Sequence, residues 1–530
     1  MHTMTDGSGV AEARQGGRWR FYRAVWRWHF YAGLLVLPFI IWLAVTGAAF
    51  LYQCAIDRSV HHDLKVVPVG DTRMPAQQLV AAAQQRYGGS LFVYTTPKRA
   101  DASAEIGLVD AHGARRVVYV DPYRARVLGA LPEHGTLSWT IRRLHSLALV
   151  GPYARGLIEM AGGWAIVLVL TGVYLWWPRG RRGGVISVRG KPKQRLFWRD
   201  LHAVTGAGVG AILLLLALTG MPWSWLWGAQ VNRWANGHDF GYPAGLRVQQ
   251  PMSQQRLADS GEPAWSLRQA RLPESVVPAR LAEGGGEPLH GEHANGLQVG
   301  NEHSGHTART VAPGHADHEE HEEHIAQSEQ SAQHAHSADS AHAAHGDAGG
   351  VAGPGRGAIG LDAAIARFDA RGILPGYSVA PPRGATGVYT ATVYPADLQR
   401  QRVIHLDQYS GTVLLDMRYR DYGPLAKLLE WGINVHLGQQ YGTANQLILL
   451  FACLAIVLLC VSAAVMWWKR RPSGGLGVPP LPADPRTLRG LLVLLVLCGL
   501  IFPLVGLSFV LMWVLDRYWM QRTQADAAAG

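Results

Sequence analysis

The sequence predicts a polytopic α-helical membrane protein with about five transmembrane helices and two periplasmic α+β domains in a pseudo-twofold parallel repeat. Three observations lead to this fold class. Only 16% of the 530 residues are charged, against about 25% in an average soluble protein. Several long stretches carry no charged residue at all. Finally, histidines, glycines and strand-like segments recur at matching spacings in two parts of the chain.

Five uncharged stretches are each long enough to cross the hydrocarbon core as a helix, which takes about 18 residues or more. A purely soluble protein is therefore excluded. The first stretch resembles a signal peptide, but it is longer than the usual hydrophobic region and no small-residue cleavage pattern follows. It therefore predicts an uncleaved anchor. The five stretches are Phe30–Tyr52, Met160–Trp177, Ala203–Ala229, Leu447–Trp468 and Gly490–Leu515.

The basic excess, a formal charge of +11, is explained by membrane topology. Residues 1–28, 178–202 and 469–489 together hold 18 Lys and Arg but only four Asp and Glu. The positive-inside rule places these segments in the cytoplasm. The long segments at roughly 54–155 and 230–444 then lie in the periplasm of a bacterium, so the protein is expected in the inner membrane. The lipid bilayer is the partner that this charge pattern predicts, and no nucleic acid is needed to explain it.

The first and third spans share one spacing of histidine and glycine. In each, a histidine is followed by a glycine four residues later and by another eighteen residues later. The second and fourth spans are likewise each preceded by a histidine, and each ends in a Trp-Trp pair at the same offset from that histidine. Both copies start in the cytoplasm, so a pseudo-twofold axis along the membrane normal relates them. It pairs His29 with His202 near the cytoplasmic face and His145 with His436 near the periplasmic face.

The segments outside the membrane repeat as well. Residues 118–128 and 404–414 alternate β-branched and other residues around a turn, which is typical of a hairpin. Each hairpin follows a candidate amphipathic helix, Pro75–Tyr87 or Leu361–Phe368. We therefore expect two small periplasmic domains. The predicted order is N-terminus 1–29, span 30–53, domain 54–144, interfacial helix and span 145–177, loop 178–201, span 202–229, linker 230–289, loop 290–350, domain 351–435, interfacial helix and span 436–468, loop 469–489, span 490–516 and tail 517–530.

Paired histidines in a membrane indicate a functional site. Gly33 and Gly206 lie one helical turn from His29 and His202, where a missing side chain leaves room for a flat group. Gly47 and Gly220 return to the same faces ~27 Å further along, at the depth of the other histidine pair. The alternatives are histidines that merely snorkel to the membrane surface or cap a helix end, and glycines that merely let helices pack closely.

The paired arrangement favours two b-type haems. Haem iron accepts axial imidazole, and two axial histidines leave no open position, which favours electron transfer. Zinc needs three or four clustered ligands, and no Cys or carboxylate accompanies these pairs. As a single helix, the stretch from His145 to Trp176 would be ~47 Å long, which exceeds the ~30 Å hydrocarbon core. We therefore expect His145 and His436 on short separate helices at the periplasmic interface.

Several motifs together resemble the PepSY-associated transmembrane family, which includes siderophore-linked iron reductases of the PiuB and FoxB type. They are LHSLALVG, WAIVLVLTGVYLWWPR, DLHAVTG, VYVDPYRARVL, IHLDQYSGTVL and VHLGQQYG. The resemblance implies PepSY-like periplasmic domains in an inner-membrane b-type cytochrome that reduces ferric siderophores in the periplasm. It also implies that His29, His145, His202 and His436 are the haem ligands. The fifth span and a long insertion depart from the family pattern.

The insertion is rich in histidine. Residues 290–345 hold 12 of the 23 histidines together with nine acidic residues and no aromatic one, a composition typical of a disordered loop. His315, His318, His321 and His324 alternate with glutamates and predict loose binding of a transition metal such as Zn, Cu, Ni or Fe. The alternative is a solvated low-complexity linker.

The electron donor is expected to be a separate molecule, because the sequence has no GxGxxG, P-loop or flavin fingerprint. A quinol, a flavin or a cytoplasmic reductase would serve. The predicted acceptor is a periplasmic ferric siderophore or a similar metal chelate. Two other functions stay open: a haem-free metal or siderophore transporter whose histidine-rich loop collects metal, and a periplasmic binding or inhibitory module on a membrane anchor.

Overall fold

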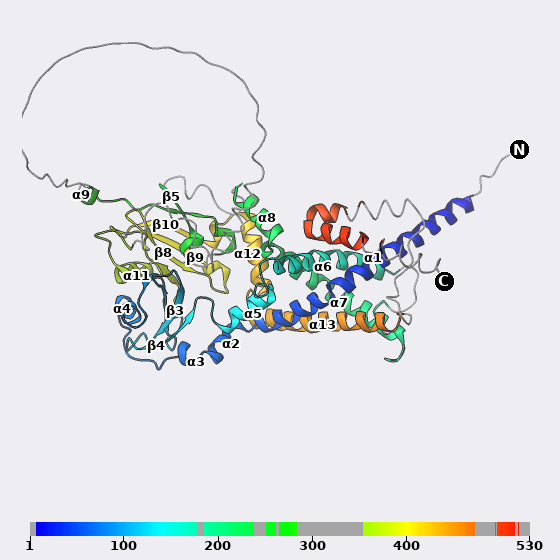
Figure 1. Ribbon diagram of the computed structural model, residues 1–530, viewed down its shortest axis with the longest axis horizontal. Helices are drawn as coiled ribbons and strands as arrows, with labels where there is room; N and C mark the ends of the chain where they lie inside the picture. Colours follow the sequence, from blue (N-terminus) through cyan, green and yellow to red (C-terminus); the bar gives the residue numbers. More distant parts are fainter. Residues whose placement is uncertain are drawn as a thin grey trace, which may run out of the picture.

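The computed structural model describes residues 7–178, 185–237, 251–260, 264–282, 353–471 and 496–514, with residues 493 and 518. Within these residues the molecule has two parts, a bundle of long apolar helices and a domain built on a β-sheet at one end of the bundle (Figure 1). The predicted histidine-rich loop lies outside the described residues. So do its four candidate metal ligands, His315, His318, His321 and His324.

Four helices of the described chain are long and apolar enough to cross a membrane. Helix α1 packs against α6 and α13, and α7 packs against the same two helices. Helices α1 and α7 therefore face each other across the bundle, and their packed side chains form a continuous apolar core. The four are α1 (Gly7–Phe50), of which Phe21–Phe50 is the apolar part, α6 (Ala154–Trp176), α7 (Arg195–Gly220) and α13 (Gly442–Trp468).

The fifth predicted span, Gly490–Leu515, does not form a single crossing helix in its described part. A bend at Phe502 precedes the helix Pro503–Val514, which is too short to span the hydrocarbon core. A Cβ on Gly499 would lie 2.8 Å from the Cα of Gly506, so the chain doubles back on itself. The red segment of Figure 1 shows this hairpin beside α6. The physical reason is Pro503, which lacks an N–H and disfavours a helical residue before it.

The sheet contains eight antiparallel strands in the order β10-β9-β8-β7-β1-β2-β3-β4. Four strands come from each half of the chain, and the halves join where Tyr94 and Thr95 of β1 pair with Val379 and Ser378 of β7. The two predicted domains thus share one sheet. The predicted hairpins correspond to β3–β4 and β9–β10. The strands are β1 (Ser90–Thr95), β2 (Ala104–Val109), β3 (Arg115–Val120), β4 (Val127–Pro132), β7 (Ser378–Ala380), β8 (Val388–Val393), β9 (Arg402–Asp407) and β10 (Val413–Arg418).

Two helices cover one face of this sheet and form its core. They are α4 (Ala76–Tyr87) and α11 (Leu361–Ala370), which match the two predicted amphipathic helices. Leu79 of α4 and Phe368 of α11 are fully buried in one cluster with Ile106 and Ile404 of the strands. A second cluster joins strand residues of the C-terminal half, such as Val403 and Met417, to three leucines from before that half. The three are Leu257, Leu267 and Leu272. These last residues belong to a segment that includes β5 (Met252–Arg256) and β6 (Arg271–Pro273).

Short helices connect the sheet to the bundle. After α1 the chain continues into α2 (Gln53–Val60) and α3 (His62–Lys65). Helices α5 (Leu137–His145) and α12 (Pro424–His436) lie at the junction, immediately before α6 and α13 (Figure 1). On the way from α7 to the second half, the chain forms α8 (Leu226–Gly237), and α9 (Ala279–Ala282) follows β6. Helices α5 and α12 carry the two histidines expected at the periplasmic interface.

Candidate functional site

His145 and His436 are each the last residue of a short helix. Helix α5 ends at His145, and the chain reverses through Gly151, whose φ of +142° suits glycine, before α6 begins. Helix α12 ends at His436, and Gly438 and Gly442 have φ of +71° and +59° ahead of α13. Each histidine is therefore held on an element separate from the span that follows it.

Threonines of the facing spans hold these two imidazoles. The Oγ1 of Thr46 in α1 donates to the carbonyl oxygen of Trp42 at 2.7 Å and lies 2.8 Å from His145 Nδ1. A hydroxyl has one hydrogen. Since that hydrogen goes to the carbonyl, the oxygen accepts from the Nδ1–H of His145. Thr219 of α7 repeats the arrangement: it donates to Leu215 at 2.7 Å and accepts from His436 Nδ1 at 2.9 Å.

The other two histidines lie inside the spans and are held in the same way. Thr171 of α6 donates to the carbonyl oxygen of Val167 at 2.7 Å and therefore accepts from His29 Nδ1 at 2.9 Å. His202 Nδ1 donates to the carbonyl oxygen of Leu459 in α13 at 3.0 Å, with the Ser462 hydroxyl 3.4 Å away. Neighbouring spans thus fix the orientation of both rings.

Sequence reasoning did not identify Thr171 and Ser462. The signal was present, because Thr171 follows His145 at the same offset at which Ser462 follows His436. Neither residue is distinctive by itself, and the shared offset has meaning only when α6 and α13 are known to lie beside α1 and α7.

All four imidazoles therefore have the same tautomer. Each donates its Nδ1–H to an oxygen and keeps the lone pair on Nε2. The hydrogen bonds described above are all made at Nδ1, and none of them uses Nε2. This is the state in which a histidine binds a metal, with the partner at Nδ1 fixing the tautomer and the ring orientation.

Glycines next to the histidines leave room for the imidazole rings. A Cβ on Gly47 would lie 3.4 Å from Cε1 of His145, and one on Gly220 would lie 3.6 Å from Cε1 of His436. The structure thus places these two glycines directly against the rings at the sheet end of the bundle, the depth at which sequence periodicity put them. The structure also brings Gly172 to His29, where a Cβ would lie 3.4 Å from Cε1.

The remaining two candidate glycines lie at contacts between spans. A Cβ on Gly33 would be 4.0 Å from Cδ2 of Leu168, and a Cβ on Gly206 would be 3.4 Å from Cδ1 of Leu459. Gly33 also lines a pocket beside His29. Whether these glycines accommodate a flat group stays a prediction.

The histidines form two pairs at two depths. His29 and His202 line one pocket. His145 and His436 lie near enough to influence each other electrostatically. On α1, His29 is about 26 Å along the helix axis from Thr46, which holds His145. Within the described ranges no group of three or more His, Cys, Asp or Glu could hold a metal ion, so each pair offers two imidazoles and no further protein ligand.

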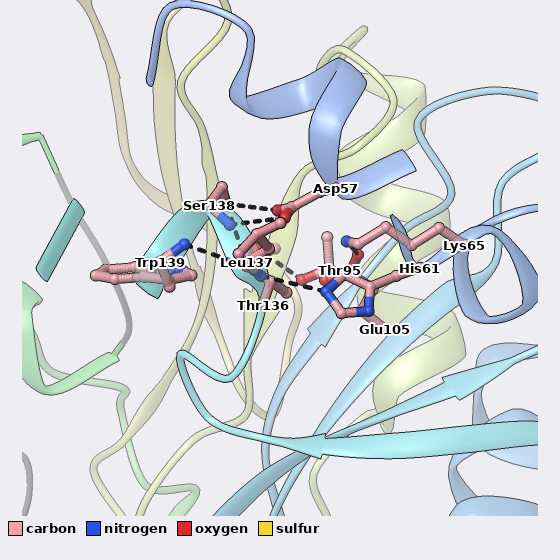
Figure 2. A network of polar contacts seen from close by, with 10 residues as sticks. Asp57, His61, Lys65, Thr95, Glu105, Thr136, Leu137, Ser138 and Trp139 are labelled. Carbon is pink, nitrogen blue, oxygen red and sulfur yellow. Dashed lines mark hydrogen bonds and ion pairs between the residues drawn. The ribbon is translucent and has the colours of Figure 1, made fainter. Parts of the chain in front are cut away.

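Helix α5, which carries His145, is fixed at its N-terminus by α2. Asp57 accepts hydrogen bonds from the backbone N–H of Ser138, at 2.9 Å, and from its hydroxyl, while His61 Nε2 accepts from the Leu137 N–H at 3.2 Å (Figure 2). A carboxylate at this position also interacts favourably with the helix dipole. At the other end, the Trp42 indole N–H donates to the Leu144 carbonyl at 2.8 Å. Both ends of α5 are thereby tied to the chain that continues from α1.

An ion pair supports the same junction. Lys65 Nζ lies 2.8 Å from Glu105 Oε1 (Figure 2) and 5.1 Å from the centre of the Tyr119 ring. Burial is the largest single effect and lowers the pKa of Lys65, but the charge and hydrogen bond of Glu105, together with Tyr119 and Asp57, raise the pKa overall. On the other side, Glu430 of α12 accepts from the backbone N–H and hydroxyl of Ser266 at 3.1 and 2.8 Å. Burial raises the pKa of Glu430 in spite of these hydrogen bonds.

Together, the apolar bundle and the sheet domain define a multi-pass membrane protein with histidine pairs at two depths. The family model for the PepSY-associated TM region matches residues 26–470. The chain therefore belongs to the PepSY-associated transmembrane family, and the resemblance found in the sequence is confirmed. No curated protein matches the chain.

Proposed function

We propose that this protein carries electrons through the membrane on two b-type haems. His29 and His202 would hold one haem, and His145 and His436 the other. The observation that carries the proposal is the shared hydrogen bonding: four half-buried imidazoles in two pairs, each with an oxygen at Nδ1, an arrangement that leaves Nε2 for a metal.

The residues present fit haem better than other metal groups. A haem supplies four ligands to its iron and needs only axial ligands from the protein. Two imidazoles per site satisfy that need, whereas structural zinc takes four protein ligands, and no such group occurs in the described chain. When bound, haem iron supplies one-electron chemistry. If each iron took two of these histidines as ligands, no open position would remain, and electron transfer would be favoured over reactions at the iron.

The direction of transfer follows from the arrangement of the chain. The positive-inside rule places the bundle end with Arg27, Arg195 and Arg470, which we call the basic end, in the cytoplasm. The sheet, whose two halves we interpret as duplicated PepSY-like domains, then lies in the periplasm of an inner-membrane protein. Each electron would reduce one ferric ion of a siderophore or similar chelate to the ferrous ion. A quinol, a flavin or a separate reductase would supply electrons at the basic end.

The deciding experiment is the reduced-minus-oxidised absorption spectrum of the purified protein. We expect a b-type α-band corresponding to two haems per chain. His145→Ala/His436→Ala and His29→Ala/His202→Ala should each remove one of the two components, whereas His112→Ala, in an exposed turn of the sheet domain, should leave both. If the wild-type protein has no such band, the proposal is wrong and the haem-free transporter becomes the better interpretation.

Reduction of a periplasmic chelate needs a separate measurement. Protein reduced with dithionite in detergent, freed of excess reductant and mixed with a ferric hydroxamate, should be reoxidised while ferrous iron is trapped by ferrozine. Reoxidation that yields no ferrous iron would contradict the chelate as acceptor and leave the haem assignment intact.

A further inference from the structure

The pocket beside His29 and His202 has an unusual lining at its outer end. Its walls come from α1 and α13, with two residues of α7 completing it. The inner part carries the two imidazoles among apolar and aromatic side chains. The outer part carries two guanidinium groups, those of Arg195 and Arg470. The lining residues are Trp26, His29, Phe30, Gly33, Leu34, Leu37, Arg195, His202, Ala463, Ala464, Met466, Trp467 and Arg470.

The two arginines have no acidic partner in the described part of the chain. No Asp or Glu lines the pocket. The nearby acidic residue of α7, Asp200, is engaged by Arg189 and Arg199 at 2.8 and 2.7 Å. Arg470 instead lies over the Trp26 ring, 4.2 Å from its centre. Two cations at one pocket mouth attract an anion with two negative charges.

The electrostatics of Arg470 agree with this description. Burial lowers its pKa, and the positive charge of Arg195 lowers it further. The two guanidinium groups are therefore close enough to repel each other. An anion bound between them would remove that repulsion and form charge-assisted hydrogen bonds, for which the planar guanidinium is well suited.

We infer that Arg195 and Arg470 bind the two propionate carboxylates of the haem held by His29 and His202. The inference rests on the proposed function and adds to it the groups that orient the haem in this pocket. A flat, largely apolar dicarboxylate matches the sequence of surfaces along the pocket: imidazoles at depth, aromatic and aliphatic walls, and cations at the mouth. The carboxylates thus face the basic end and the porphyrin faces the interior of the bundle.

A propionate held by arginine carries less uncompensated negative charge beside the iron. The ferric haem has one more positive charge than the ferrous haem, so uncompensated carboxylates favour the ferric form. Removing either arginine is therefore expected to lower the midpoint potential of this haem and to weaken its retention. The haem of His145 and His436, about 26 Å away along α1, should be unaffected.

The test is a potentiometric titration of the full-length protein, followed by the α-band, for Arg195→Gln, Arg470→Gln and the double variant. The matched control is Arg471→Gln, because Arg471 is a neighbouring exposed arginine that stacks on Trp468 and does not line the pocket. The component lost in His29→Ala/His202→Ala identifies the haem of interest. We expect that component to move to lower potential in each single variant and to fall in occupancy in the double variant. Arg470→Lys, which keeps the charge, should restore most of the potential.

Three outcomes would overturn the inference. Unchanged potential and occupancy in the arginine variants would show that the pair does not contact the haem. An equal shift in Arg471→Gln would reduce the effect to surface charge. If wild-type protein stripped of anionic lipid already has the low midpoint potential of the arginine variants, the arginines bind a lipid headgroup and not the haem. Absence of haem from the wild-type protein is a different result, because it refutes the proposed function itself.

Discussion

The most direct test of the tautomer argument is Thr46→Val. Valine has nearly the shape of threonine but has no hydroxyl, so His145 loses the oxygen that accepts from its Nδ1–H. A buried donor left without a partner costs about 1–3 kcal/mol, which corresponds to roughly a 5- to 150-fold change in a binding constant. Loss of an outer-shell partner of a metal-bound histidine typically weakens binding about 10- to 100-fold. The two ranges overlap, so we expect haem affinity at this site to fall by about tenfold or more.

The assay compares two haem components in one protein. Haem transfer to excess apomyoglobin should accelerate for the component assigned to His145 and His436 and stay unchanged for the other. The midpoint potential of the His145 and His436 component should rise, because an imidazole that no longer donates from Nδ1 is a weaker electron donor to iron. Thr46→Ser keeps the hydroxyl and should behave like wild type. Thr443→Val, at an exposed position early in α13, controls for the loss of a threonine. If Thr46→Val holds both haems with unchanged potentials, the assignment of Thr46 as the partner of His145 is refuted.

Four further predictions test other parts of the structure. Asp57→Asn should lower the free energy of unfolding of the sheet domain by about 1–2 kcal/mol, because α5 loses a charged partner at its N-terminus. Asp63→Asn, at an exposed position, should leave that free energy unchanged. Gly47→Leu or Gly220→Leu should remove one of the two haems through a clash with His145 or His436, while Gly208→Leu, with nothing within 4 Å of its Cβ, should keep both. A reporter inserted after Val514 should lie on the same side as one inserted after Arg471, since Pro503–Val514 returns toward Trp28, and opposite sides would contradict the hairpin. Deleting residues 290–345 should leave both haems bound; their loss would give that segment a structural role.

The contacts of Gly47 with His145 and of Gly220 with His436 were predictable from spacing alone. Two helices with histidine, glycine and glycine at the same offsets must present those residues at matching depths, because the rise per residue of an α-helix is constant. The structure indeed brings Gly47 to His145 and Gly220 to His436. What spacing could not show was the partner of each Nδ1. Thr171 acts on His29 from a different helix, far away in the chain, and such contacts depend on how the spans are rotated against each other.

The sheet shows a similar limit. Hairpins β3–β4 and β9–β10 were readable, because alternation and turn residues are local signals. The pairing of β1 with β7 was not, because it joins strands from opposite halves of the chain through only two described pairs, Tyr94 with Val379 and Thr95 with Ser378. Strand neighbours of that separation are chosen by tertiary packing, here the shared core under α4 and α11. The repeated hairpins and helices therefore predicted two domains but could not show that their strands join in one sheet.

The C-terminal hairpin packs on one of two spans that follow a histidine at the same spacing, and these two spans differ in the side chains they offer it. In α6, Gly156 and Gly163 leave space that Leu504 and Val505 fill, and Trp164 donates to Ser508 at 2.8 Å. The corresponding face of α13 carries large apolar side chains in place of the glycines, with Leu447 and Leu454 56% and 62% exposed.

One face is thus shaped for a protein partner and the other for lipid. This difference explains why a stretch hydrophobic enough to cross the membrane folds back. Its apolar surface is buried against α6, and a polar group inside the bundle, the Ser508 hydroxyl, finds a protein partner there. An apolar stretch in a helical protein therefore predicts burial in the membrane region. Whether it crosses depends on interruptions such as Phe502-Pro503 and on the small residues of the helix that receives it.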